Sequence, residues 1–164
     1  MALEFRTLDK TFDRNSFDCG IAELNNFLKR EARQQQGHGF NVTLVLVDSA
    51  NPTKILGYYS MMSSGINAES LPPEIAKKLP KHPIPAIRIG RLARDLSTKG
   101  QGIGELLMAN ALERIKRVST EVGVYCVIVD SKNEAAKNFY LKYGFIEFTD
   151  APMSLFLPIT AFPK

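Results

Sequence analysis

Cysteine and histidine are scarce in this sequence, and neither is arranged for metal binding. Cys19 and Cys126 lie far apart, and neither belongs to a CxxC motif or to a cluster of cysteine and histidine. The two histidines, His38 and His82, lie in glycine-rich or proline-rich contexts and lack the spacing of a metal site or of a Ser/His/Asp triad. The sequence therefore predicts neither a metal site nor a disulfide, and we expect both cysteines to be buried as small apolar residues.

Long apolar runs, repeats and low-complexity segments are also missing. The longest apolar stretches have the length of a strand and are interrupted by charges, and the first residues lack the apolar run of a signal peptide. We therefore expect a cytoplasmic protein without a membrane-spanning segment. The length of 164 residues and the hydrophobic content of 45% fit one compact domain, which we predict over residues 1–164.

The net charge is +4, so an anionic partner is expected. The basic residues are spread along the chain in small groups, and such groups are more often solvated faces than binding sites. Charge alone does not distinguish a phosphate-bearing coenzyme from a nucleic acid.

Hydrophobic periodicity predicts the elements of the N-terminal half. Apolar residues recur at helical spacing between 21 and 36, and Asp18 could cap this helix. The stretches 41–47 and 55–62 are typical of strands joined by a turn, which predicts an antiparallel hairpin.

A strand–helix–strand unit is expected in the C-terminal half, with a strand over 86–92, a helix over 102–120 and a strand over 124–129. Such a unit places its two strands parallel. A further helix over 132–143 and a strand over 153–157 follow. The predicted fold class is therefore α/β, with a central mixed sheet flanked by helices.

A glycine-rich segment, Lys99-Gly100-Gln101-Gly102-Ile103-Gly104, separates the expected strand from the helix that follows. Glycines let the backbone approach a bulky pyrophosphate without Cβ clashes, and the N–H groups at a helix N-terminus form an anion site. The spacing fits neither a dinucleotide GxGxxG motif nor a GxxxxGK[ST] P-loop. The alternative is a helix-entry turn that binds nothing.

Two blocks of sequence resemble the acetyl-CoA-binding core of GNAT acetyltransferases. The first is Arg91-Leu92-Ala93-Arg94-Asp95 with the glycine segment after it; Gly102 and Gly104 match the family pattern [Gln/Arg]-x-x-Gly-x-[Gly/Ala]. Lys99 departs from that pattern, since lysine keeps the positive charge but lacks the planar fork of arginine. The second block, residues 133–145, resembles the stretch in which a helix flanks the coenzyme. The resemblance implies the GNAT acyltransferase fold, N-acetyltransferase activity, acetyl-CoA as cosubstrate and no metal.

The same resemblance implies roles for particular residues. A free strand N–H near Leu92 or Ala93 would bind the thioester oxygen, and Tyr140 would give a proton to the departing thiolate. The alternative for Tyr140 is a packed helical aromatic. Asn133 and Asn138 would touch the pantetheine or adenine portions, although Asn133 could equally be only a first-turn helix residue.

Over nearly the whole chain the sequence is similar to the GNAT toxins of bacterial toxin–antitoxin pairs. The similarity rests on Phe17-Asp18-Cys19-Gly20, on Leu24-Asn25-Asn26-Phe27-Leu28, and on Pro83-Ile84-Pro85 before the strand. It implies acetylation of the α-amine of an aminoacyl-tRNA to block translation, a ribbon-helix-helix antitoxin and a homodimer. The candidate tRNA contacts are six basic side chains: Lys29, Arg30, Arg33, Arg88, Arg91 and Arg94. Arg91 could also be a structural strand residue or a coenzyme contact.

No carboxylate stands out as a general base. An α-amine, with a pKa of about 8, needs less help than a lysine amine at about 10.4, which favours an α-amino acceptor. Glu23, Glu31 and Asp95 are still candidates for a general base. Two other functions are possible: a GNAT enzyme acetylating a small amine, a protein N-terminus or a lysine, and a silent acyl-CoA-binding module, which the retention of Tyr140 disfavours.

Overall fold

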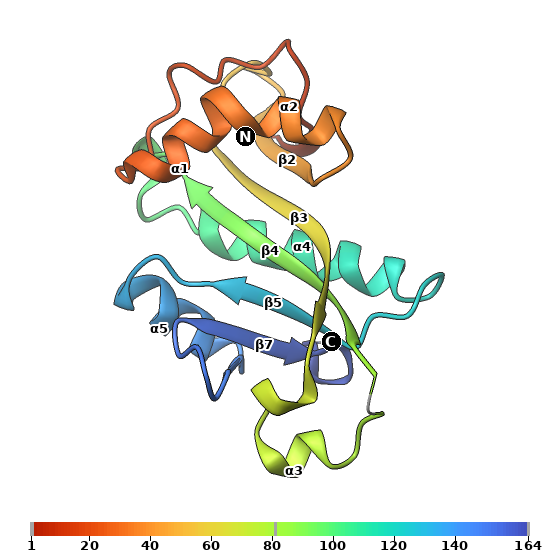
Figure 1. Ribbon diagram of the computed structural model, residues 1–164. Coiled ribbons are helices and arrows are strands. Elements are labelled where there is room, and N and C mark those ends of the chain that lie inside the picture. The colour runs from red at the N-terminus through yellow and green to blue at the C-terminus, as the bar shows by residue number, and fades with distance from the viewer. Residues whose placement is uncertain (1, 81, 164) are drawn as a thin grey trace. The chain divides into compact units, whose positions relative to one another are not determined.

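The computed structural model describes residues 2–80 and 82–163 (Figure 1). The strands are β1 (Leu3–Thr7), β2 (Val42–Asp48), β3 (Gly57–Ile66), β4 (Ile84–Arg94), β5 (Cys126–Asp130), β6 (Ile146–Glu147) and β7 (Ser154–Pro158). The helices are α1 (Ala22–Asn26), α2 (Ala32–Gly37), α3 (Pro73–Ala76), α4 (Ile103–Val118) and α5 (Glu134–Lys142).

The strands follow the hydrogen-bonded order β1-β2-β3-β4-β5-β7-β6. Strands β4 and β5 are parallel and are joined through α4, whereas β1–β2, β2–β3, β5–β7 and β6–β7 are antiparallel. The sheet is therefore mixed, and the predicted α/β class, hairpin and strand–helix–strand unit are confirmed. No helix over the described residues is long and apolar enough to cross a membrane.

Two compact units divide the chain, and each is described by itself. The first contains the residues up to 62 together with 91–111, and the second contains 63–90 and the residues from 112 onward.

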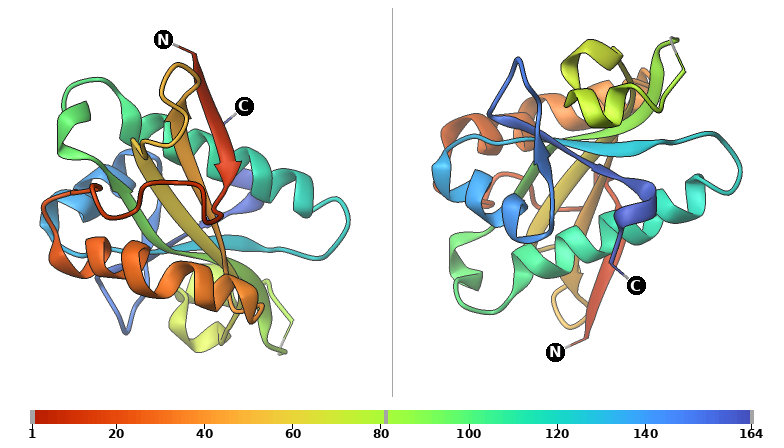
Figure 2. Two further views of the ribbon diagram at one scale, coloured as in Figure 1. Left: turned by 90° about the horizontal axis from the view of Figure 1, so that it is seen from above. Right: turned by 90° about the horizontal axis from the view of Figure 1, so that it is seen from below.

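In the first unit, a helical segment over residues 22–37 packs on the β2–β3 hairpin (Figure 2). Its buried side chains, among them Phe27 and Leu28, join Val45 and Tyr58 of the hairpin in one apolar cluster. The Tyr58 hydroxyl donates to the Leu24 carbonyl at 2.6 Å, so the buried phenol has a partner. These contacts fix the helical segment to the sheet.

The start of this helical segment differs from the prediction. Ile21, not Asp18, is the N-cap, and it makes no side-chain capping bond. The Asp18 carboxylate instead accepts hydrogen bonds from the Gly20 N–H and the Asn25 side chain, at 2.8 and 3.0 Å. Between α1 and α2 the chain makes a π-helical turn over Phe27–Glu31. The predicted helix is therefore present, but the predicted cap is wrong, because the Asp18 carboxylate bonds to the Gly20 N–H and the Asn25 side chain and not to a backbone N–H of the first helical turn.

In the second unit, β5 pairs with β4 on one side and with β7 on the other. Cys126 on β5 is fully buried and joins Phe148 and Phe156 in an apolar cluster, as expected of a small apolar residue. Helix α5 ends at Lys142, and Gly144 follows the C-cap residue Tyr143 with a φ of +92°, the left-handed conformation that favours glycine.

Candidate active site

The turn that leads from β4 to α4 is fixed by one buried carboxylate. Asp95 accepts hydrogen bonds from the backbone N–H groups of Ser97 and Asp18, at 3.0 and 2.9 Å. Burial by itself would raise the pKa of Asp95, but these hydrogen bonds and the charge of Lys54 bring it below its ordinary value. A carboxylate held in this way is a weak base, so Asp95 is a structural residue of the turn.

The glycine segment has the backbone geometry of an anion site. Gly100 and Gly102 have φ of +80° and +73°, which other residues adopt only with strain. The Leu106 N–H donates to the Gly102 carbonyl at 3.1 Å, and this bond closes the first turn of α4. The N–H groups of Ile103, Gly104 and Glu105, which precede it, have no backbone acceptor among the described residues. They lie at the positive end of a 16-residue helix, where a phosphate is stabilised.

Side chains in the segment leave this backbone accessible. Lys99 and Gln101 are exposed, and the Ile103 side chain is buried beneath the turn. The Gln101 side chain reaches the Ser97 carbonyl at 3.5 Å. The segment therefore presents mainly N–H groups and one lysine to its surroundings.

The end of β4 distinguishes between the two predicted thioester-binding N–H groups. The Asp95 N–H donates to the carbonyl of the residue before β3 at 2.9 Å, and the Ala93 carbonyl lies 3.1 Å from where a Cβ on Gly57 would stand. Along a strand, successive residues turn their N–H and C=O groups to opposite sides. The Ala93 N–H therefore points toward β3, and the Leu92 N–H points to the other side, past the end of the register between β4 and β5. Leu92 is the better placed of the two.

Tyr140 lies on α5 in the second unit, with only 4% of its surface exposed. Its ring packs against Phe145 at 5.7 Å. Burial, together with the nearby Asp130 carboxylate, raises the pKa of Tyr140 far above its ordinary value. The phenol is therefore protonated throughout the neutral range, which a proton donor requires.

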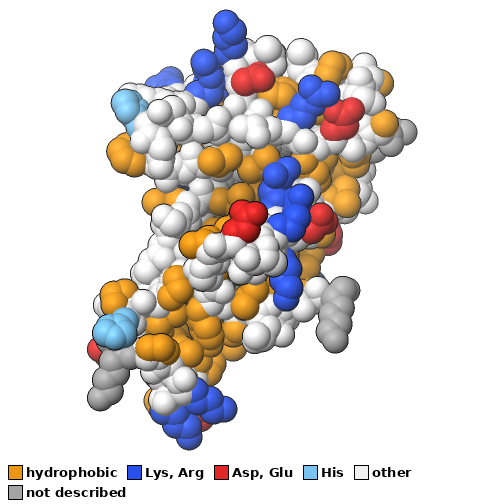
Figure 3. All heavy atoms as spheres, turned by 90° about the vertical axis from the view of Figure 1, so that its right-hand side faces the viewer, with side chains coloured by type: hydrophobic (Ala, Val, Ile, Leu, Met, Phe, Trp, Pro, Cys, Tyr) orange, Lys and Arg blue, Asp and Glu red, His pale blue; other side chains and the backbone are white. Residues whose placement is uncertain are grey.

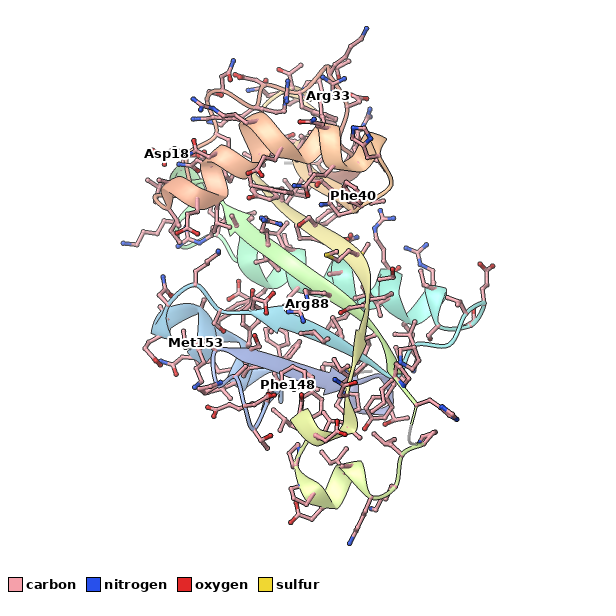
Figure 4. The ribbon with its side chains drawn as sticks, viewed as in Figure 1. Asp18, Arg33, Phe40, Arg88, Phe148 and Met153 are labelled. Carbon is pink, nitrogen blue, oxygen red and sulfur yellow. The ribbon has the colours of Figure 1, made fainter. Side chains whose placement is uncertain are left out.

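Asp130 is a functional candidate that the sequence reasoning missed. At the end of β5, its Oδ1 atom accepts from the Arg88 guanidinium at 2.6 Å and from the Ser154 hydroxyl at 2.8 Å. The signal that could have found it is its position directly after a parallel strand, where sheets of this class bind ligands. Arg88 lies over β5 and is held by this ion pair (Figure 4), so it is not free for a phosphate.

Two asparagines of the predicted coenzyme site lie on α5, and one of them has a structural role. The Asn133 side chain caps the helix by accepting from the Ala136 N–H at 2.8 Å. Asn138 is exposed on the same helix. Asn133 is thus a helix cap as well as a candidate contact.

The six basic side chains predicted to contact tRNA differ in their surroundings. Lys29, Arg30 and Arg33 lie on the helical segment, and Arg33 is on its outer side (Figure 4). The Arg91 guanidinium stacks over the Phe27 ring at 3.8 Å, and one terminal nitrogen of Arg94 is buried without a partner among the described residues. Figure 3 shows lysine and arginine side chains in separate groups on the face that it draws. The basic residues therefore do not form one continuous surface there.

The glycine turn lies inside the parallel β4–α4–β5 unit, and its N–H groups at the N-terminus of α4 form a site for a phosphate-bearing ligand. The chain belongs to the GNAT family, because the model of the acetyltransferase (GNAT) domain matches residues 41–147. Among the described residues no cluster of histidine, cysteine, aspartate and glutamate could hold a metal ion.

Within this family the chain is similar to toxins. It is 30% identical over 155 residues to a probable toxin TacT of Sinorhizobium fredii, covering 90% of this chain and 85% of that protein. It is 24% identical over 152 residues to a tRNA-acetylating toxin of Mycobacterium tuberculosis, covering 93% and 89%.

Solved structures of the toxin AtaT have the same fold. AtaT complexed with acetyl-methionyl-tRNAfMet matches with a TM-score of 0.90 and 32% identity, over 97% of this chain and 96% of that one. A tyrosine-to-phenylalanine mutant of AtaT, bound to acetyl-CoA and to the C-terminus of the antitoxin AtaR, matches with a TM-score of 0.85 and 29% identity, over 98% and 96%.

Proposed function

We propose that this chain is a toxin that transfers an acetyl group from acetyl-CoA to the α-amine of an aminoacyl-tRNA, and so blocks translation. The observation that carries the proposal is the likeness, over nearly the full length of both chains, to AtaT in its complex with acetyl-methionyl-tRNAfMet. The relative that acetylates tRNA supports the same acceptor.

The coenzyme pyrophosphate is assigned to the glycine turn. The N–H groups of Ile103, Gly104 and Glu105 would donate to its oxygens, and Lys99 would add a positive charge. Gly100 and Gly102 let the backbone approach closely, and the backbone of Gln101 lies between them. Asn138 is exposed and available to a more distant part of the coenzyme, and Asn133 would contact it while capping α5.

For the transfer itself, the neutral α-amine attacks the thioester carbon and forms the C–N bond. The Leu92 N–H donates to the oxygen on which negative charge develops. As the C–S bond breaks, the electron pair leaves with sulfur, and the Tyr140 hydroxyl gives that sulfur its proton. The surplus proton of the amine passes to water, and Tyr140 takes a proton back from water, which restores the phenol. Positioning and this one proton donor account for the catalysis.

An α-amine suits this set of residues. Of the carboxylates left open as bases, Asp95 is held by the turn that it supports, and Glu31 is exposed on the helical segment. With a pKa of about 8, an α-amine is partly neutral at physiological pH and can react without a strong base.

The remaining features of the proposal follow from the toxin class. We propose two protein partners, a ribbon-helix-helix antitoxin and a second copy of the chain. We propose the cytoplasm, where charged tRNA is found, as the site of action. The whole chain, residues 1–164, would act as one GNAT domain.

The test is an acetylation assay with purified protein and labelled acetyl-CoA. The acceptors are charged tRNA, the same tRNA uncharged, and free polyamines. We expect label only on the charged tRNA, at its aminoacyl group. Label on polyamines or protein but never on aminoacyl-tRNA would contradict the toxin assignment and favour a general amine acetyltransferase.

A further inference from the structure

One oxygen of the Asp130 carboxylate, at the end of β5, has no role in the chemistry described above. The Oδ1 atom accepts both the Arg88 guanidinium, at 2.6 Å, and the Ser154 hydroxyl, at 2.8 Å. The other oxygen, Oδ2, has no hydrogen-bond partner among the described residues. It is not one of the buried polar atoms that lack a partner, and the side chain is 35% exposed. A carboxylate accepts several hydrogen bonds, so Oδ2 is open to a ligand.

Asp130 lies where the pairing of two parallel strands ends. The register between β4 and β5 ends at Ile89 and Val129, one residue before Asp130. On the other side, Asp130 still pairs with Ser154 of β7. Arg88 pairs with the residue two positions before Asp130, so the side chains of Arg88 and Asp130 point to the same face of the sheet. Sheets of this class bind ligands outside the carboxyl ends of their parallel strands, which is where Oδ2 lies.

The ion pair holds the carboxylate in place and leaves Oδ2 as its negative end. Arg88 reaches Asp130 through one terminal nitrogen, on the side of Oδ1. The negative charge of Asp130 also acts on Tyr140, since it contributes to the raised pKa of that phenol. Asp130 is therefore near the hydroxyl that we assign as the proton donor to sulfur. A group bound to Oδ2 would lie near the reacting atoms.

We propose that Oδ2 of Asp130 binds the primary amine of the acetyl acceptor, and we name this position the amine subsite. An amine offers N–H donors to a group that only accepts, and its protonated form adds a charge-assisted hydrogen bond. Holding the amine supplies part of the positioning that the reaction needs. The carboxylate also favours the positive charge that the nitrogen gains as it attacks the thioester. The inference rests on the proposed function, because the ligand is the amine of that acceptor.

A primary amine fits this oxygen better than other ligands do. A phosphate would be repelled by the carboxylate. A metal ion needs several protein ligands, and the described residues contain no group of three side chains that could hold one. A hydroxyl group can donate one hydrogen bond to Oδ2 but brings no positive charge to it. The amine subsite should therefore distinguish an amine from a hydroxyl group.

The test compares two RNA ligands that differ in this one group. One is bulk tRNA charged with amino acids, and the other is the same charged tRNA with its α-amines replaced by hydroxyl groups. Binding is measured at neutral pH without acetyl-CoA, so it does not depend on acetyl transfer. The wild type should bind the amine form about tenfold more tightly. In Asp130→Asn this preference should fall to about twofold or less, because the charge is lost. The control Asp150→Asn, at an exposed carboxylate of the same unit, should keep the wild-type preference.

A second variant, Arg88→Gln, separates amine binding from maintenance of the ion pair. The glutamine carboxamide can donate to Oδ1 but carries no charge. We expect a preference of at least about tenfold in Arg88→Gln, since the opposing positive charge is gone. If Asp130 served only as the partner of Arg88, both variants would break the ion pair and would have the same effect. The preference is a ratio of two affinities of one variant, so a smaller folded fraction leaves it unchanged.

Three results would overturn the amine subsite. They are a wild type that labels aminoacyl-tRNA but binds both forms equally, a tenfold preference retained in Asp130→Asn, and equal loss of the preference in Asp130→Asn and Arg88→Gln. Free polyamines separate this inference from the proposed function. If the wild type labels polyamines but never aminoacyl-tRNA, and Asp130→Asn raises the polyamine KM about tenfold with the acetyl-CoA KM unchanged, the amine subsite stands and the proposed function fails.

Discussion

The glycine turn and the surroundings of Tyr140 provide two parts of the proposed chemistry in different ways. The turn uses backbone N–H groups and the direction of one helix, and its side chains at Lys99 and Gln101 are exposed. The Tyr140 region uses one buried side chain, Tyr140, and three partly buried ones brought together from β4, β5 and β7. Coenzyme binding at the glycine turn should therefore tolerate the loss of a side chain but not a bulky group placed near its backbone. Turnover should depend on single side-chain atoms of the Tyr140 region.

The most severe change to the backbone site is Gly104→Glu. A side chain and a negative charge would enter the N-terminus of α4, where the N–H groups should face phosphate. We expect acetyl-CoA affinity to fall by about 10²-fold or more, measured by calorimetry on protein shown to be folded by circular dichroism.

Gly123 offers a matched control for this change. It is exposed, its φ is not in the left-handed region, and nothing lies within 4 Å of a Cβ placed on it. Gly123→Glu should bind the coenzyme as the wild type does. Unchanged acetyl-CoA affinity in Gly104→Glu would contradict the assignment of the pyrophosphate to the glycine turn.

In the side-chain site, Tyr140→Phe removes one oxygen atom and leaves the packing against Phe145 intact. We expect turnover to fall by about 10²-fold, with unchanged acetyl-CoA affinity, because only the proton donor is lost. The control Tyr125→Phe alters a partly buried tyrosine of the same unit and should have no effect. Wild-type turnover in Tyr140→Phe would leave Tyr140 as a packed aromatic.

The pH dependence of the wild type tests the same residue. Burial raises the pKa of Tyr140, so its loss of the proton moves to higher pH and the hydroxyl stays a donor well above neutrality. Turnover should therefore rise as the acceptor amine loses its proton, near pH 8, and should not fall again before about pH 10. A descending limb between pH 8 and 9 would contradict a protonated Tyr140 in that range.

The same difference explains how much could be predicted from the sequence. The glycine turn could be predicted because its ligand groups are backbone atoms, and the spacing of Gly100 and Gly102 alone defines where they point. Asp130 was harder to predict, because its partners Arg88 and Ser154 are 42 and 24 residues away, and its position at the end of a parallel strand is the one local signal. Strand β1 escaped prediction for a similar reason, since its pairing with β2 is non-local.

An intermediate effect is expected for Asp130→Asn, which keeps the shape of the side chain but removes its charge. The Arg88 guanidinium loses its ion pair, and the position of β5 beside Tyr140 is no longer fixed by charge. We expect turnover to fall by roughly tenfold, with coenzyme affinity unchanged. Asp150→Asn, which alters an exposed carboxylate of the same unit, is the control. Equal effects in both variants would show that Asp130 has no special role.

The smallest effect is expected for Lys99→Ala, which tests whether the turn depends on backbone or on side chains. Lys99 is exposed, so its contact with a phosphate would be partly screened by solvent and salt. We expect acetyl-CoA affinity to weaken by about fivefold, ~1 kcal/mol, and less at high salt. Lys116→Ala, in the last turn of the same helix, should leave the affinity unchanged. A loss as large as that of Gly104→Glu would mean that the lysine, and not the row of N–H groups, holds the pyrophosphate, and the contrast between a backbone site and a side-chain site would then fail.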